Sequence, residues 1–370
     1  MSLSKFTYDL LLVGSGLFNA IIAREATRKG LKCLVLDKRE HIGGNLFCEN
    51  VEGIQVHKYG PHIFHTKDKR IWEYVNNLVS FNHFILSPIA RYKDKLYNLP
   101  FNMNTFYQLW GTITPQEAVK KLREQRIPIK KDNLEEKALS LVGKDIYETL
   151  IKGYTEKQWG KPATELPAFI IQRLPVRFRY DNNYFNDPYQ GVPMGGYNHM
   201  IEECFKGCDI QLQTDFLSDR EYLKKQAEKI IFTGMIDAYY EYLFGVLEYR
   251  SLHFETERLE MDNYQGNAVV NYTEREIPYT RIIEHKHFEF GTQTHTVITR
   301  EYPVEWDKEK EAFYPVNTTE NNERYKKYQI LSQKEPDVIF GGRLGSYKYL
   351  DMDQIIYLAL DISKEILKCF

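Results

Sequence analysis

The chain has 370 residues, enough for roughly two or three domains, and its 49 basic and 51 acidic side chains leave a net charge of −2. Such a balance excludes a strongly basic surface for nucleic acid or an anionic membrane, so we expect neither as a partner. No apolar run is long enough to cross a bilayer, and the first residues lack the order of a signal peptide. We therefore expect a soluble cytoplasmic protein.

Cysteine and tyrosine add two compositional points. Cys204 and Cys208 lie four residues apart in a predicted helix, but no second pair of Cys or His residues completes a metal site. We expect free thiols and no bound metal. The 27 tyrosines offer apolar faces with hydrogen-bonding tips, which suit either wet core edges or a cleft for a base and a sugar. Composition leaves both interpretations open.

A predicted βαβ unit opens the chain. An apolar strand over 8–13 leads through Gly14 and Gly16 into a helix over 17–29, and a second strand ends at Asp37. In a dinucleotide-binding fold, the first glycine allows a tight turn, and the second lets backbone N–H groups approach a pyrophosphate at the helix N-terminus. The acidic residue suits the ribose hydroxyls. This order of elements predicts a dinucleotide site.

One residue departs from the Gly-x-Gly-x-x-Gly fingerprint, because Asn19 stands where the third glycine belongs. That glycine serves close packing of the helix on the strand and does not contact phosphate. We therefore expect Asn19 to loosen the packing without weakening the binding of phosphate, with its side chain turned outward.

A second glycine pair, Gly43 and Gly44, favours FAD over NAD. NAD-binding domains have no need of such a doublet, whereas in flavoproteins bare backbone commonly passes there under the longer cofactor. The late segment "FGGRLGSYKYLDMDQII" would bring a strand, Arg343 and a helix N-terminus near Met352 to the same cofactor.

The remaining elements predict two insertions. Thr114, Pro115 and Glu117 form a capping box at the start of a helical stretch that continues to about residue 160. Strand-like alternation occurs over 83–100, with a turn at 93–95, and over 249–254, 268–272, 279–287 and 294–302.

The predicted fold class is α/β: a discontinuous Rossmann-like FAD-binding domain with an inserted helical bundle and an antiparallel β-sheet domain. We assign 1–82, 190–240 and 325–370 to the FAD-binding domain, 101–180 to the helical domain, and 83–100, 181–189 and 241–324 to the sheet domain.

Seven motifs follow in order along the chain: "YGPHIFHT", "GYTEKQWG", "RLPVRF", "DNNYF", "YQGNAVVNY", "PYTRIIEHK" and "GRLGSYKYLDMD". Each is weak alone, but together they resemble the bacterial UDP-galactopyranose mutases over essentially the whole chain. The resemblance implies an isomerase that interconverts UDP-galactopyranose and UDP-galactofuranose, with the same three-part fold.

The resemblance also implies the mechanism and the partners. In that family reduced FAD acts through N5 as a nucleophile at the anomeric carbon and displaces UDP, with no net redox change. The sequence fits, since it has no Ser-His-Asp order, no paired-carboxylate motif and no metal cluster. The implied partners are UDP-galactose, an external reductant such as NAD(P)H, and a second copy in a homodimer. The implied product is galactofuranose for cell-surface polysaccharide.

Individual residues match the family's site. The matching catalytic residues are Arg173, Arg281 and His62. The matching substrate-binding residues are Tyr154, Trp159, Arg173, Tyr184, Arg281, Tyr314, Tyr349 and Asp351. The cofactor-binding residues are Gly14, Gly16, Leu17, Asp37, Gly43, Gly44, Asn45, His62, Arg343 and Met352. A guanidinium suits a diphosphate because it binds in a fork and keeps its proton.

Four residues carry further expectations. Leu150 and Ile151 occupy positions where some relatives have aromatic residues, so part of the base platform is expected to be aliphatic. His65 is expected to be structural, whereas Arg343 is expected to favour an anionic reduced flavin.

A mobile substrate loop is expected at about residues 160–178. Its three prolines among apolar residues exclude one continuous helix. We expect the loop to close over UDP and to bring Arg173 to the diphosphate.

Three alternatives stay open. A close variant would act also or mainly on UDP-N-acetylgalactosamine, depending on the space beside the sugar's 2-position. A redox flavoenzyme of the amine-oxidase type could use the same scaffold. A non-catalytic binder of nucleotide sugars would not need the flavin half.

Overall fold

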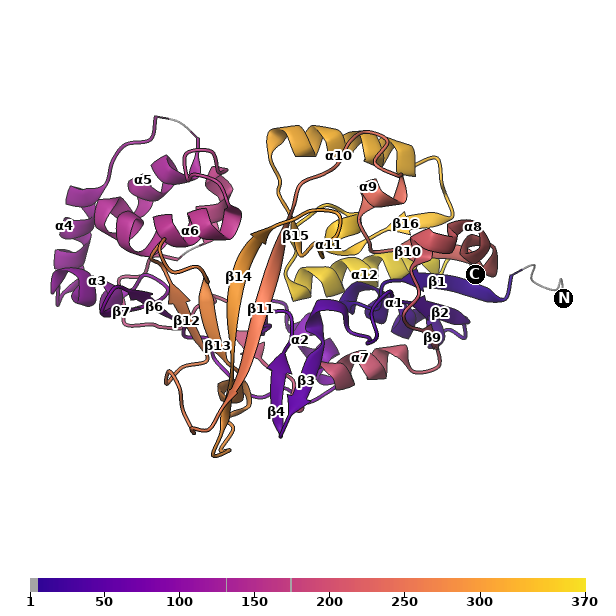
Figure 1. The fold of residues 1–370 in the computed structure, drawn as a ribbon, viewed down its shortest axis with the longest axis horizontal. Helices are drawn as coiled ribbons and strands as arrows, with labels where there is room; N and C mark the ends of the chain where they lie inside the picture. Colours follow the sequence, from indigo (N-terminus) through magenta and orange to yellow (C-terminus); the bar gives the residue numbers. More distant parts are fainter. Residues whose placement is uncertain (1–5, 131, 174) are drawn as a thin grey trace.

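The structure is a computed structural model that describes residues 6–130, 132–173 and 175–370; at residues 172 and 173 it describes the backbone only. A parallel sheet with its helices occupies one end of the molecule, a group of helices occupies the other, and long strands lie between them (Figure 1). The fold is therefore α/β, with a Rossmann-like part, a helical part and a second sheet, as the sequence predicts.

Five parallel strands form the Rossmann-like sheet, in the order β16-β10-β1-β2-β9. Their bounds are β1 (Tyr8–Val13), β2 (Cys33–Leu36), β9 (Asp209–Gln211), β10 (Ala227–Phe232) and β16 (Val338–Phe340). β2 is buried throughout, as expected where helices cover both faces of a parallel sheet. Helix α1 (Leu17–Thr27) begins as predicted, ends two residues early, and packs against α7 (Tyr197–Phe205) and α12 (Met352–Ile366).

The larger sheet has seven strands in the order β15-β11-β14-β13-β12-β6-β7. Their bounds are β6 (Ile89–Tyr92), β7 (Lys95–Asn98), β11 (Tyr249–Leu259), β12 (Val269–Tyr272), β13 (Arg281–Glu284), β14 (Thr296–Glu305) and β15 (Tyr314–Pro315). The predicted turn at 93–95 is confirmed between β6 and β7.

Two expectations for this sheet are wrong. The sheet is not antiparallel throughout, because β12 pairs with β6 in parallel. β6 belongs to a segment far upstream of β12, so no hairpin sets their relative direction. The predicted strand over 279–287 is shorter, since residues His285–Glu289 form a 3-10 helix, η6. Residues 282–286 are buried in succession, which breaks the alternation of a strand with one wetted face.

The helical part contains α3 (Met103–Trp110), α4 (Pro115–Gln125), α5 (Leu134–Ile146), the π-helix η2 (Tyr147–Ile151), α6 (Lys152–Trp159) and the 3-10 helix η3 (Ala168–Arg173). The predicted capping box at α4 is confirmed, with the Thr114 and Glu117 side chains each accepting the other's backbone N–H. Gly143 interrupts α5 with a φ of 76°, and Gly160 ends α6 with a φ of 67°. Ala118, Leu122 and other apolar side chains form one core here.

Shorter elements complete the chain. They are η1 (Gly44–Leu46), β3 (Cys48–Val51), β4 (Ile54–His57), β5 (Phe64–Thr66), α2 (Lys69–Asn76), β8 (Tyr189–Gly191), η4 (Phe216–Asp219), α8 (Arg220–Leu223), η5 (Lys224–Gln226), α9 (Ile236–Tyr239), α10 (Thr319–Ser332) and α11 (Gly342–Gly345). Across the described ranges, no helix combines the length and the apolar character needed to span a membrane. No cluster of potential metal ligands occurs in the same ranges, and all five cysteines are free thiols.

Candidate active site

The two predicted glycine pairs lie against each other at the N-terminus of α1. Gly43 donates its N–H to the carbonyl of Ser15 (3.0 Å), and a Cβ on Gly44 would lie 3.0 Å from the Cα of Gly16. Gly14 has a φ of 93°, and a Cβ there would lie 2.2 Å from the Thr233 hydroxyl. Gly16 faces open space, so bare backbone and a helix N-terminus form a surface that fits a pyrophosphate.

A third glycine turn joins this surface from the C-terminal end of the chain. A Cβ on Gly342 would lie 3.3 Å from the side chain of Thr233, the same residue that closes over Gly14. Arg343 follows in α11, where its Nε donates to the carbonyl of Leu350 (2.9 Å) and its guanidinium lies 5.2 Å from the ring centre of Tyr349. The structure thus brings the predicted cofactor segments together.

Asn19 does not turn outward, which corrects our expectation. The side chain is fully buried, and its amide nitrogen donates to the carbonyls of Val13 (3.0 Å) and Gly14 (2.8 Å), with a long contact to Ile231 (3.5 Å). Asn19 therefore links β1, the glycine turn and β10. It can do so because the side-chain amide has two N–H donors, and the carbonyls of these segments point toward it. The amide oxygen has no partner among the described residues.

The residues predicted to lie near the cofactor's ribose form hydrogen bonds within the protein. The Asp37 carboxylate accepts the backbone N–H and hydroxyl of Ser15 (2.8 and 2.6 Å) and the N–H of Arg39 (2.9 Å). Asn45 accepts from a terminal nitrogen of Arg39 at 3.0 Å. Leu17, at the start of α1, is 5% exposed, so its backbone N–H is the part that could meet a ligand. The roles of these residues toward a cofactor stay predictions.

His62 lies between the glycine turns and the larger sheet. Its peptide is fixed on both sides, with the N–H donated to His57 Nδ1 (3.1 Å) and the carbonyl accepting the hydroxyl of Tyr197 (3.0 Å). Burial lowers the pKa of His62 to about 3, and the nearby Arg343 and Arg281 add to this effect. The ring is therefore neutral at pH 7 and close to two permanent cations.

Arg281, at the start of β13, is the centre of the predicted substrate site. Its Nε donates to Oε1 of Glu301 on β14 (2.9 Å), a residue 3% exposed. Burial lowers the pKa of Arg281, but Glu301 and then the phenols of Tyr154, Tyr349 and Tyr314 offset it, and the net shift is upward. Arg281 therefore keeps its charge in a largely buried site.

The predicted tyrosines surround this cation. Burial raises the pKa of Tyr154 to about 12 although Arg281 lowers it, and Glu301, Tyr184 and Tyr349 raise it further. Burial, followed by Glu301 and Tyr349, raises the pKa of Tyr314. These phenols are protonated at pH 7 and can donate hydrogen bonds to an anion.

An edge-to-face series of rings continues the site toward α6. The Trp159 and Tyr314 ring centres lie 5.6 Å apart, and those of Tyr314 and Tyr349 lie 5.8 Å apart. The Trp159 indole nitrogen and the Tyr314 hydroxyl are buried, and neither finds a hydrogen-bond partner in the described ranges. Buried donors of this kind cost free energy until a ligand satisfies them, so this group of residues suits a polar ligand.

The remaining expected residues lie at the start of α12 or in the helical part. Asp351 caps α12 and Met352 begins that helix, with the Gln354 side chain accepting the Asp351 N–H at 2.9 Å. Leu150 and Ile151 are 5% and 2% exposed within the helical core, so they do not form an open aliphatic platform here. The η3 helix ends at Arg173, whose side chain lies outside the described residues.

Comparison with known proteins assigns the family. A model for UDP-galactopyranose mutase matches residues 149–349, and a model for an NAD(P)-binding Rossmann-like domain matches residues 12–78. A dTDP-fucopyranose mutase of Escherichia coli is 38% identical, over 97% of this chain and 98% of its own. A probable UDP-galactopyranose mutase of Klebsiella pneumoniae is also 38% identical, over 97% of this chain and 94% of its own.

The chain belongs to the UDP-galactopyranose mutase family.

Members of the UDP-galactopyranose mutase family are isomerases, and the Rossmann-like match together with the family implies a flavin cofactor. A crystal structure of reduced UDP-galactopyranose mutase shares the fold, with a TM-score of 0.74 at 13% identity over 99% of this chain and 95% of that chain.

Two residues in this mutase-family site escaped sequence analysis. Glu301 pairs with Arg281 because the register of β13 and β14 sets them opposite each other, which no local motif reveals.

Arg250, on β11, is 6% exposed and donates through Nε to the carbonyl of Gln158 (3.1 Å). A Cβ on Gly160 would lie 2.6 Å from its Nη1, so the glycine that ends α6 makes room for this cation. Only the opposed register of β11 and β15 places Arg250 beside Tyr314.

We expect Asn19→Asp to weaken FAD binding at least about tenfold. The carboxylate would face the carbonyls of Val13 and Gly14, which now accept the amide hydrogens. The free energy of unfolding of the apoprotein should fall by about 1–3 kcal/mol. Flavin fluorescence measures FAD binding, and urea unfolding measures stability. The control is Asn19→Gly, which restores the third glycine of the Gly-x-Gly-x-x-Gly fingerprint. An aspartate variant with wild-type FAD affinity would show that the turn does not need the amide.

We expect acid to destabilise the protein through its buried histidines. Burial lowers the pKa of His57 and His62 to about 3 and that of His285 well below its usual value. The unfolded chain takes up these protons at about pH 6.5, so stability falls as pH drops from about 6.5 toward 3, by up to about 1.4 kcal/mol per pH unit for each ring. Urea unfolding at several pH values measures the slope.

His57→Asn should make that slope shallower, whereas substitution of the exposed His253 by Gln should leave it unchanged. Equal slopes for the wild type and His57→Asn would remove His57 from the explanation.

Proposed function

We propose that this protein is a flavin-dependent mutase that interconverts UDP-galactopyranose and UDP-galactofuranose, with FAD active in its reduced form. The observation that carries the proposal is the position of Tyr349, whose ring centre lies 5.2 Å from the Arg343 guanidinium at the cofactor turns and 5.8 Å from the ring centre of Tyr314 among the predicted substrate tyrosines. One site therefore unites the cofactor side and the anion-binding side, as transfer of a sugar between a nucleotide and a cofactor requires.

The cations and phenols hold the leaving group. Nε of Arg281 is bound to Glu301, so the terminal NH2 groups are the ones we expect to meet the diphosphate. Cleavage of the anomeric bond places further negative charge on UDP, and these contacts then strengthen in the transition state. The orphaned donors of Trp159 and Tyr314 can bind the same group or the sugar hydroxyls. Tyr154, Tyr184 and Tyr349 complete the predicted cradle.

The cofactor side supplies the chemistry. When bound, reduced FAD provides an electron-rich ring nitrogen that can attack the anomeric carbon without net oxidation. Arg343 keeps a positive charge beside this part of the site and would stabilise a reduced anionic ring. His62, held neutral by burial, can donate or accept one hydrogen bond there without adding charge.

A second candidate substrate deserves the same assay, because the relative named dTDP-fucopyranose mutase is as similar to this chain as the Klebsiella relative. The two substrates differ in the methyl group of the base, the ribose 2′-hydroxyl and the sugar 6-hydroxyl. UDP-N-acetylgalactosamine remains the third candidate. A homodimer, reduction by NAD(P)H and a role in cell-surface polysaccharide belong to the same proposal.

The decisive experiment is turnover by the dithionite-reduced, FAD-loaded protein. We expect UDP-galactofuranose to convert to the pyranose form when the protein is reduced, with little conversion when it is oxidised. Parallel assays with dTDP-fucofuranose and UDP-N-acetylgalactofuranosamine rank the substrates. Oxygen consumption with substrate and no isomerisation would favour the amine-oxidase type of activity and exclude the proposal.

We expect Arg281→Lys and Arg173→Ala to slow turnover of the reduced protein, each by about 2–4 kcal/mol in activation free energy. A lysine cannot reproduce the fork that binds Glu301 and phosphate together. Steady-state kinetics at saturating reductant measure the loss, and FAD content controls for misfolding. Wild-type rates in either variant would remove that arginine from the mechanism.

A further inference from the structure

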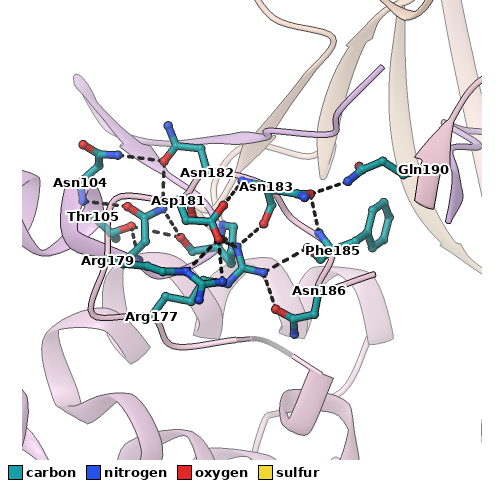
Figure 2. A network of polar contacts seen from close by, with 12 residues as sticks. Asn104, Thr105, Arg177, Arg179, Asp181, Asn182, Asn183, Phe185, Asn186 and Gln190 are labelled. Atoms are coloured by element: carbon teal, nitrogen blue, oxygen red, sulfur yellow. Dashed lines mark hydrogen bonds and ion pairs between the residues drawn. The ribbon is translucent and has the colours of Figure 1, made fainter. Parts of the chain in front are cut away.

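Residues 181–186, the Asn-rich segment that carries Tyr184, wrap around the guanidinium of Arg177 (Figure 2). Arg177 is 7% exposed. Nη1 donates to the carbonyls of Asn183 and Asp181 (3.4 Å for the latter) and lies 3.3 Å from the Asp181 carboxylate. Nη2 donates to the carbonyl of Phe185 (3.2 Å) and to Oδ1 of Asn186 (2.6 Å).

The segment has no regular secondary structure, so no helix or strand ladder satisfies its carbonyls. Buried backbone carbonyls need donors, and a guanidinium supplies several in a fixed plane. Burial lowers the pKa of Arg177, although Asp181 raises it, and the net shift is downward. Burying a guanidinium costs desolvation free energy. That cost suggests that the conformation of the 181–186 segment serves the function of the protein.

Side chains outside the segment fix its other parts. Asn102 and Asn104 donate to Oδ1 of Asn182 at 2.9 and 3.0 Å, and Gln190 donates to Oδ1 of Asn183 at 2.9 Å (Figure 2). His65, the residue expected to be structural, pairs with Asp187 (2.6 Å).

The segment places Tyr184 near another of the predicted substrate tyrosines. The Tyr184 N–H donates to the carbonyl of Leu86 (2.8 Å), and its phenol is close enough to Tyr154 to raise the pKa of that residue. Tyr184 thus lies near Tyr154, on a loop that the guanidinium of Arg177 helps to hold in place.

We propose that Arg177 is a positioning residue that holds the 181–186 segment so that Tyr184 reaches the diphosphate of the substrate. The inference rests on the proposed function, since it assigns Tyr184 a nucleoside diphosphate ligand. Arg177 itself touches no ligand. It also anchors the end of the predicted substrate loop, because its N–H donates to the carbonyl of Phe101 (2.8 Å) and Val176 bridges to the same residue.

Arg179 provides a matched control. It binds the same carboxylate, with Nε and Nη2 donating to Oδ2 of Asp181 at 3.1 and 2.9 Å. Its side chain is 70% exposed, however, and it donates to that carboxylate rather than to the segment's carbonyls. Substitution of Arg179 therefore removes an equal charge from the same place without releasing the segment.

The experiment compares Arg177→Met, Arg179→Met and Tyr184→Phe, alone and in pairs, by titrating the FAD-loaded protein with UDP. We expect Arg177→Met to raise the dissociation constant of UDP about tenfold and Arg179→Met to change it less than about twofold. In the Tyr184→Phe background, most of the Arg177 effect should disappear, because both changes remove the same contact. Hydrogen exchange over 181–186 should rise in Arg177→Met alone, with FAD content unchanged.

Two outcomes would overturn the inference. One is unchanged UDP affinity in Arg177→Met despite faster exchange, and the other is an equal loss with and without the Tyr184 hydroxyl. If Arg177→Met does not retain FAD, Asn186→Ala replaces it, since this change removes one acceptor of the same guanidinium. A wild-type protein that binds neither UDP nor dTDP would instead contradict the proposed function.

Discussion

The ion pair between Arg281 and Glu301 is the interaction on which the site depends. It joins two neighbouring strands, and the same carboxylate lies against the segment that leads to His62, because a Cβ on Gly60 would lie 3.2 Å from its Oε2. Gly60 has a φ of 98°, so a side chain there would be strained as well as crowded. A buried pair of this kind contributes little net stability. Its value is a guanidinium that already has a fixed orientation and needs no reorganisation when an anion arrives.

The protein surrounds this pair with irregular backbone, and two further cations, Lys157 and Arg177, hold that backbone in place. Lys157 donates to the carbonyls of Tyr272, Ile277 and Tyr279 (2.8 to 3.0 Å) and so fastens α6 to the connection that leads into β13. Gly153 permits the close approach, because a Cβ there would lie 2.3 Å from the carbonyl of Thr273. Arg177 does the same for the segment of Tyr184. These hydrogen bonds hold the loops in one conformation, so residues without regular secondary structure can still position the aromatic side chains.

Sequence analysis predicts the parts of this molecule that local patterns control. The βαβ unit, the capping box at Thr114 and the glycine pairs follow from periodicity, capping and turn chemistry. The family motifs name the candidate site residues, whose roles stay predictions. Local patterns do not predict which residues become partners in the folded protein. The pairing of Arg281 with Glu301 depends on the register of two strands. The parallel pairing of β6 with β12 depends on two segments that are far apart in the sequence. The inward direction of Asn19 depends on carbonyls that only the folded turn exposes.

The parallel pair of β6 and β12 also bears on how the chain reaches its native state. Val270 pairs with Ile89, so about half the polypeptide, including every helix of the α3–α6 group, lies in the loop that this pairing closes. The entropic cost of closing a loop grows with its length, and contacts of such long range form slowly. The core of the α3–α6 group draws its residues from 90–171, all inside that loop, whereas the contact of α6 with β14 joins the group to strands beyond it. The arrangement of α6 beside the sheet therefore requires this long-range pairing as well as the local contacts of the α3–α6 group.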